Sequence, residues 1–120
     1  MSYDISIGVL IKGEGSEHDD YMFNLTEPEL ANPTYNLRGI FTQSTGWNYK
    51  QGVWYKCEEV IPLIEIGILE LKYHAEHYRH LEPENGWGTV EAALAALESI
   101  KKCINETKKQ VPMHYLYMKW

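Results

Sequence analysis

Two prolines limit the longest helical pattern in this 120-residue chain to the stretch between about Glu58 and His80. Pro62 is tolerated only in the first turn of a helix, where its missing N–H has no partner to lose. Pro83 sets the other limit, because the residue before a proline is driven out of the helical region. The first half of this segment is apolar nearly all round, which predicts burial on two sides. The sheet would cover one side, and a second helix or a subunit interface the other.

A second long helix is predicted after the loop Asn85–Gly88. Thr89 or Gly88 can cap it, Glu91 favours its first turn, and the pattern ends near residues 105–109. Its apolar residues recur at helical spacing and form one stripe. The members of this stripe are Val90, Ala93, Leu94, Leu97, Ile100 and Ile104.

Three segments are expected to form strands. Residues 3–12 alternate between apolar and polar side chains, which is typical of a half-buried strand. After a polar turn, Tyr21–Leu25 can return as a second strand. The run of residues 114–120, which follows a proline, predicts a terminal strand.

The middle of the chain adds a short helix and an aromatic connection. Leu37, Ile40 and Phe41 keep helical spacing, and the helix must end near Gly46. The aromatic residues of 47–55 are expected in a connection without regular structure. The sequence therefore predicts a single α+β domain over residues 1–120, with a small, mainly antiparallel sheet packed against two long helices and one short helix.

Composition excludes several classes of function. The chain carries 17 acidic and 11 basic residues, a formal net charge of −6, which argues against binding to a nucleic-acid backbone. It lacks the pattern of a signal peptide, and no apolar run approaches the length that spans a membrane. Cys57 and Cys103 have no metal-binding spacing and are expected to be reduced, inert thiols. These features predict a cytoplasmic protein that contacts neither membrane nor nucleic acid and needs no cofactor.

The loop Asn85-Gly86-Trp87-Gly88 is the first candidate for a ligand site. Asn and Gly tolerate positive φ, so Asn85-Gly86 alone would be an ordinary turn. Gly88 also lets backbone amides at the start of a helix approach an anion or a carbonyl oxygen. Trp87 either fills the core or offers a stacking face. The loop is thus either a simple helix start or one wall of a pocket.

A second candidate precedes the short helix, where Asn32, Thr34 and Asn36 alternate around Pro33 and Tyr35. In an extended chain these three polar side chains point to one side and supply donors and acceptors. They either cap the helix and satisfy local backbone groups, or they orient a polar small molecule.

The histidines give a weak metal candidate. Glu70, His74 and His77 project from one face of the predicted first long helix, and a carboxylate with two imidazoles can hold a divalent ion. The spacing differs from HExxH, and no second helix offers an obvious fourth ligand. A solvated helix face explains the same pattern.

Several motifs occur together in a fixed order and carry a family resemblance. The sequence resembles a family of small uncharacterised proteins of bacteriophages, prophages and some bacteria, over roughly residues 30–120. The resemblance implies a phage-encoded protein acting in the host-cell cytoplasm, and it implies no catalytic residues. The motifs are Asn32, Thr34 and Asn36, then Glu59 and Pro62 at a helix start, and finally Tyr78, Pro83, Asn85-Gly86-Trp87-Gly88 and Cys103.

Three functions fit these residues. The first is a non-enzymatic binding protein whose polar-aromatic pocket, built from the two Asn-rich motifs, takes a nucleotide-like ligand. The second is an acidic module that binds or inhibits a host protein through exposed aromatic side chains. The third is a metal-dependent hydrolase built on Glu70, His74 and His77. The first two also predict a homodimer, formed through the two-sided apolar helix.

Overall fold

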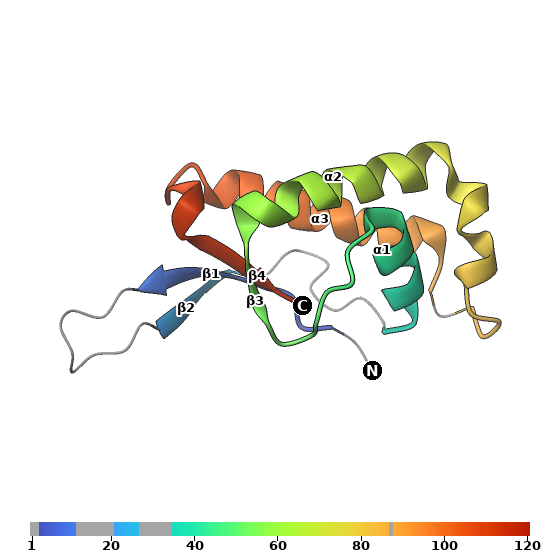
Figure 1. The fold of residues 1–120 in the computed structure, drawn as a ribbon, viewed down its shortest axis with the longest axis horizontal. Coiled ribbons are helices and arrows are strands. Elements are labelled where there is room, and N and C mark those ends of the chain that lie inside the picture. The colour runs from blue at the N-terminus through green and yellow to red at the C-terminus, as the bar shows by residue number, and fades with distance from the viewer. Residues whose placement is uncertain (1–2, 12–20, 27–34, 87) are drawn as a thin grey trace.

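The computed structural model describes residues 3–11, 21–26, 35–86 and 88–120. It confirms the predicted α+β class, with a four-stranded antiparallel sheet and three α-helices (Figure 1). The strands lie in the order β2-β1-β4-β3, so the two central strands come from opposite ends of the described chain. The strands are β1 (Ser6–Ile11), β2 (Tyr21–Thr26), β3 (Trp54–Lys56) and β4 (Leu116–Lys119).

The helices form a second layer over one face of the sheet. The two long helices lie side by side and run in opposite directions, with the short helix packed beside them (Figure 1). The short helix ends where the sequence predicts, since Gly46 takes the left-handed conformation with φ 69°. These helices are α1 (Arg38–Thr45), α2 (Cys57–Tyr73) and α3 (Val90–Thr107).

The core lies between the sheet and the helices. Ile7 of β1 pairs with Met118 of β4 on the face of the sheet that the helices cover, and both side chains are fully buried, as is Leu116 on the same face. Helix α3 contributes its predicted stripe, including Leu97, and α2 contributes buried residues such as Ile64. The strand side of this core consists of Ile5, Ile7, Leu116 and Met118.

Gly67 allows the three helices to approach one another. A Cβ atom at this position would lie 2.6 Å from Thr45 Cγ2 of α1 and 2.9 Å from Leu97 Cδ1 of α3. Both distances are shorter than side chains tolerate, so only glycine fits here without rearrangement. The close packing of α1, α2 and α3 therefore depends on this residue.

The first long helix ends earlier than predicted. It stops at Tyr73, and the segment expected to continue it to His80 forms two 3-10 turns instead, Ala75–His77 and Arg79–Leu81. A 3-10 turn has three residues per turn, so residues three apart share one face. Ala75, Tyr78 and Leu81 have this spacing, and all three pack against the core. Burial of this face explains the change of helix type.

One strand was not predicted. Residues 47–55 were expected to lack regular structure, but Trp54–Lys56 pairs with β4 and forms the edge strand β3. Three residues are too few to show an alternating pattern, so the pairing with β4 defines this strand. The predicted strands at 3–12, 21–25 and 114–120 are present with shorter or shifted bounds, and a 3-10 turn, Met113–Tyr115, precedes β4.

The aromatic residues of this region form part of the core. Trp120 stacks on Tyr49 with ring centroids 4.1 Å apart, and Tyr3 and Phe41 contact the same indole. Trp120 and Tyr49 are at most 2% exposed, and none of the tryptophans that the structure describes is exposed. Among the described residues, the exposed aromatic side chains open to the predicted host-binding role are therefore Phe23, Tyr73 and Tyr115 rather than tryptophans.

Candidate ligand-binding site

The loop before α3 has a structural reason for both of its glycines. Gly86 takes φ 75° in a turn whose N–H donates to the carbonyl of Pro83 over 3.2 Å. Gly88 takes φ 149° and is buried. A Cβ atom on Gly88 would lie 3.2 Å from Leu37 Cδ2 and 3.3 Å from Asn36 Cβ. The positive φ favours glycine at position 88, and the close packing leaves little room for a Cβ atom.

The two Asn-rich motifs meet in space at this point. Asn36 belongs to the 3-10 turn Tyr35–Leu37 before α1, and its Cβ atom lies next to Gly88. Asn36 and Asn85 are exposed. Asn36 of the first motif and Gly88 of the second are therefore in packing contact. The other predicted members, Asn32, Thr34 and Trp87, lie outside the described residues.

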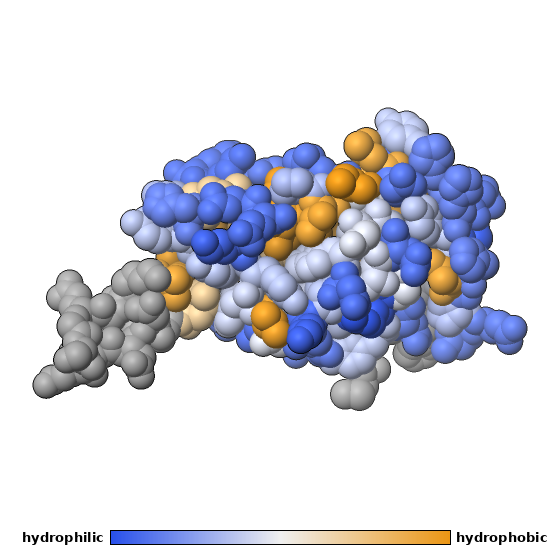
Figure 2. Space-filling model, in the orientation of Figure 1, coloured by the Kyte–Doolittle hydropathy of each residue, from blue (hydrophilic) through white to orange (hydrophobic). Residues whose placement is uncertain are grey.

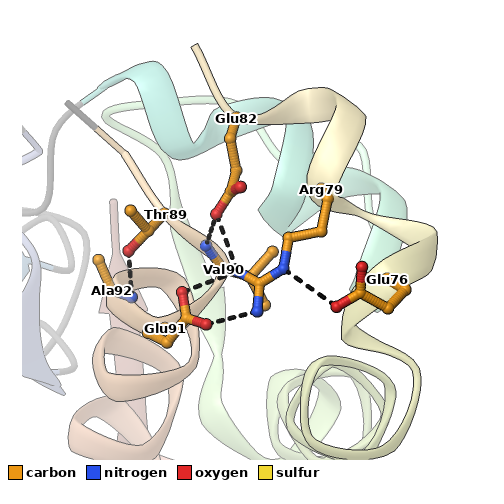
Figure 3. Close-up of polar contacts among 7 residues, drawn as sticks. All are labelled: Glu76, Arg79, Glu82, Thr89, Val90, Glu91 and Ala92. Carbon is orange, nitrogen blue, oxygen red and sulfur yellow. Dashed lines mark hydrogen bonds and ion pairs between the residues drawn. The ribbon is translucent and has the colours of Figure 1, made fainter. Parts of the chain in front are cut away.

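A network of polar side chains holds the start of α3 (Figure 3). Thr89 accepts a hydrogen bond from the N–H of Ala92 at 3.1 Å, which confirms the predicted cap. Glu82 accepts a second bond from the N–H of Val90 at 2.8 Å. Arg79 pairs with both Glu82 and Glu91, so the 3-10 turn before the loop is tied to the helix after it.

This network serves the helix start rather than a ligand. The pKa of the Glu91 carboxyl is held down at about 2, mainly by hydrogen bonds from the Arg79 guanidinium and then by one from the backbone N–H of Glu91 itself. Arg79 bonds the carboxylates of Glu76, Glu82 and Glu91, so its donors are largely occupied. The sequence alone did not reveal that Arg79 and Glu82 bind the start of α3, because Glu91 and the Val90 N–H lie 12 and 8 residues after them without a recognisable motif.

The histidine face does not form as predicted. Because α2 ends at Tyr73, His74 and His77 lie beyond the helix, with their rings stacked 5.4 Å apart. Glu70 accepts a hydrogen bond from the Tyr78 hydroxyl at 2.9 Å. Within the described residues there is no group of three His, Cys, Asp or Glu side chains arranged to hold a metal ion.

A different pocket lies on the other side of the 3-10 turn that carries Asn36. It is a depression of about 420 Å³ that is largely open to solvent, and it includes Tyr35, the residue between the polar side chains of the N-terminal motif. Of the described residues, two cations and no carboxylate line it, in a chain whose net charge is −6. The lining residues are Tyr3, Tyr35, Arg38, Tyr49, Lys50 and Gln51.

Arg38 is held in this pocket by hydrogen bonds and by a cation–π contact. Its Nη2 atom donates to the side-chain oxygen of Asn48 at 3.0 Å and to the carbonyl of Tyr49 at 2.9 Å. Its guanidinium carbon lies 4.6 Å from the centroid of the Tyr49 ring, a cation–π distance. A hydrogen bond with the Tyr3 side chain raises the pKa of Arg38 above its ordinary value, although burial opposes this shift. Among the described residues no carboxylate pairs with Arg38.

Tyrosine rings form the remaining wall. Tyr3 and Tyr35 meet edge to face with centroids 4.6 Å apart, and the Tyr49 hydroxyl donates to that of Tyr3 over 3.1 Å. The Gln51 amide donates to the Tyr35 hydroxyl and links the two sides of the pocket. Burial, followed by the bond to Tyr3, raises the pKa of Tyr49 far above its ordinary value. Tyr49 is therefore a neutral hydrogen-bonding group at physiological pH.

A second hollow of about 370 Å³ lies beside α2 and α3. Four lysines line it, among them Lys72 and Lys101, but Glu98 and Glu106 share the same surface. Lys101 already lies 3.8 Å from Glu65 of α2. Its charges are thus mixed and partly paired, in contrast to those of the Arg38 pocket.

Comparisons with known proteins assign no family. No protein-family model, curated protein or solved structure matches this chain. The resemblance to small phage and prophage proteins therefore stays a prediction from the motifs alone. Over the described residues, no helix is long and apolar enough to cross a membrane.

Proposed function

We propose that this protein binds a small anionic ligand with a planar ring, such as a nucleotide, in the Arg38 pocket and without catalysing a reaction. One observation carries the proposal. Arg38 is held in place by neutral acceptors at a pocket wall and has no carboxylate partner among the described residues. A guanidinium that neutral acceptors hold in place favours a phosphate or carboxylate as a further, charged partner.

The rest of the pocket fits the other half of such a ligand. Tyr35 is half-buried and offers part of its ring at the wall, and Lys50 supplies a second cation from the exposed side. Aromatic rings bind flat bases by stacking, whereas lysine acts as a point charge toward phosphate. A volume of about 420 Å³ is sufficient for a mononucleotide.

The experiment uses isothermal titration with nucleoside monophosphates, the matching nucleosides and inorganic phosphate. A monophosphate should bind more tightly than either of its parts, because each part reaches only one half of the pocket. Lys50→Gln should weaken this binding about tenfold or more, the typical value of a charge-assisted hydrogen bond. Lys102→Gln removes the same charge from α3, outside the pocket, and should leave binding unchanged.

Tyr35→Leu tests the stacking wall. This variant should lose most of the preference for the nucleotide over inorganic phosphate, while phosphate binding persists. Absence of heat with all ligands at millimolar concentration would reject the proposal. Equal weakening by Lys50→Gln and Lys102→Gln would reject it too, because binding would then follow net charge rather than this pocket.

A further inference from the structure

An apolar stripe runs along α2 on the face opposite to the core. Ile66, Leu69 and Tyr73 are exposed by 49%, 56% and 72%, and Pro62 at the start of the helix is exposed as well. Figure 2 shows hydrophobic residues gathered over α2 on the outside of the molecule. Side chains of this size seldom remain in water along a whole helix.

The spacing of this stripe is that of a helix–helix seam. Its members, which we call the α2 stripe, follow at intervals of four, three and four residues, as a and d positions do in a coiled coil. On the opposite side of the helix, Ile64, Gly67 and Leu71 are already buried in the core. Thus α2 has two apolar faces, and its own domain covers one of them.

The charges beside the stripe indicate what covers the other face. Glu65 and Lys72 lie on the same flank, seven residues apart, and both are exposed. When two copies of a helix pack in opposite directions about a two-fold axis, equal flanks face each other. Glu65 of each copy then meets Lys72 of the other copy, giving two attractive pairs.

A parallel arrangement would have the opposite effect. In a parallel pair, opposite flanks of the two helices face each other. Glu65 of one copy would then face Glu70 of the other copy. Charges at these flanking positions commonly set the orientation of paired helices. We infer that the α2 stripe binds a second copy of this chain, with the two α2 helices antiparallel about a two-fold axis.

This dimer is independent of the proposed ligand pocket, since the two surfaces share no residue. The weight-average mass should rise with concentration toward twice the 14.0 kDa of one chain, measured by sedimentation equilibrium across the micromolar range. Leu69→Glu should abolish this rise, because it buries two carboxylates in the seam. Phe23→Glu is the matched control: Phe23, on β2, is also 56% exposed, and the variant should dimerise like the parent.

Charge reversal tests the orientation. Lys72→Glu should raise the dissociation constant about five- to tenfold, since it converts two attractive pairs into two repulsive ones. Glu65→Lys should weaken the dimer similarly, and the double variant Glu65→Lys, Lys72→Glu should restore it. Thermal unfolding verifies that each variant is folded, because Glu65 also contacts Lys101 of its own chain.

Three results would overturn this inference. The first is a monomeric parent protein at high micromolar concentration, which is also what a stripe reserved for a different protein would give. The second is loss of the dimer in Phe23→Glu but not in Leu69→Glu, which would move the interface to the sheet edge. The third is failure of the double charge reversal to restore the dimer, which would exclude the antiparallel pair.

Discussion

Glu82 caps a helix that begins eight residues after it, through a hydrogen bond of 2.8 Å from the N–H of Val90 to its carboxylate. Thr89 caps the same helix by accepting from the N–H of Ala92. The two residues satisfy different N–H groups of the first turn, which has no helical partners for them. The start of α3 is therefore fixed both from its own cap and from the preceding 3-10 turn.

Loss of the Thr89 side chain should have a measurable effect. Thr89→Ala should lower the free energy of unfolding by about 1 kcal/mol, because the Ala92 N–H loses its acceptor. Thr89→Ser keeps the hydroxyl and should stay close to the parent. Urea unfolding followed by circular dichroism measures both. If Thr89→Ser lowers the free energy of unfolding as much as Thr89→Ala does, the effect comes from the threonine methyl group rather than from the cap.

The ion pair between Arg79 and Glu91 predicts a dependence on pH. Arg79 lowers the pKa of Glu91 to about 2 in the folded protein, from an ordinary value of 4.5. The contribution of the Arg79–Glu91 pair to stability is thus present above about pH 5, and it disappears as the pH falls toward 2. The Tm difference between the parent and Glu91→Gln should therefore shrink from pH 7 to pH 3.

The size of this effect should be modest. The Arg79 and Glu91 side chains are 35% and 66% exposed, so water and salt weaken their attraction. The difference at pH 7 should decrease further in high salt. Glu98→Gln, two turns further along α3, removes an equal charge away from Arg79. A pH-dependent Tm difference of the same size in Glu98→Gln would contradict the assignment.

Two glycines should respond in opposite ways to alanine. Gly67→Ala should destabilise the protein by about 1–3 kcal/mol, because its Cβ would collide with Thr45 and Leu97. Gly39→Ala in α1 meets only Leu81, at an ordinary 3.8 Å, and should be neutral or stabilise by up to about 1 kcal/mol. Chemical denaturation compares the two, and destabilisation by Gly39→Ala would contradict the packing argument.

The two cysteines should differ in reactivity. They are not joined in a disulfide, Cys57 is fully buried, and Cys103 is half-buried. Burial, followed by repulsion from Cys103, raises the pKa of the Cys57 thiol to about 12, so its thiolate is scarce at pH 8. A chromogenic disulfide reagent should modify Cys103 in the native protein, and Cys57 only after unfolding. Rapid reaction of native Cys103→Ser would show that Cys57 is accessible.

Sequence periodicity predicted those parts of the fold that have a long enough signal. The stripe of α3 and its Thr89 cap follow directly from the spacing of apolar residues and from capping preferences. The end of α2 could not be predicted in this way, because the three-residue spacing of Ala75, Tyr78 and Leu81 fits both an α-helix and a 3-10 turn. Contact with the core selects the tighter turn there.

The candidate site was predicted only in part. The contact between Asn36 and Gly88 agrees with the expected meeting of the two motifs. The Arg38 pocket did not follow from the sequence, since its groups come from three separate segments and gather through the packing of Tyr3 against Tyr35 and Tyr49. Such a site has no spacing rule, so only the tertiary fold reveals it.

The strand order has a consequence for protein synthesis. The centre of the sheet pairs residues 6–9 with residues 116–119, so more than a hundred residues separate the two partners. Helices α1, α2 and α3 can form before β4 has left the ribosome, but β1 lacks its central neighbour until β4 is available. Contacts this distant in sequence slow folding. Until β4 is present, the edge of β1 that faces away from β2 stays unpaired, so the sheet can be completed only late in folding.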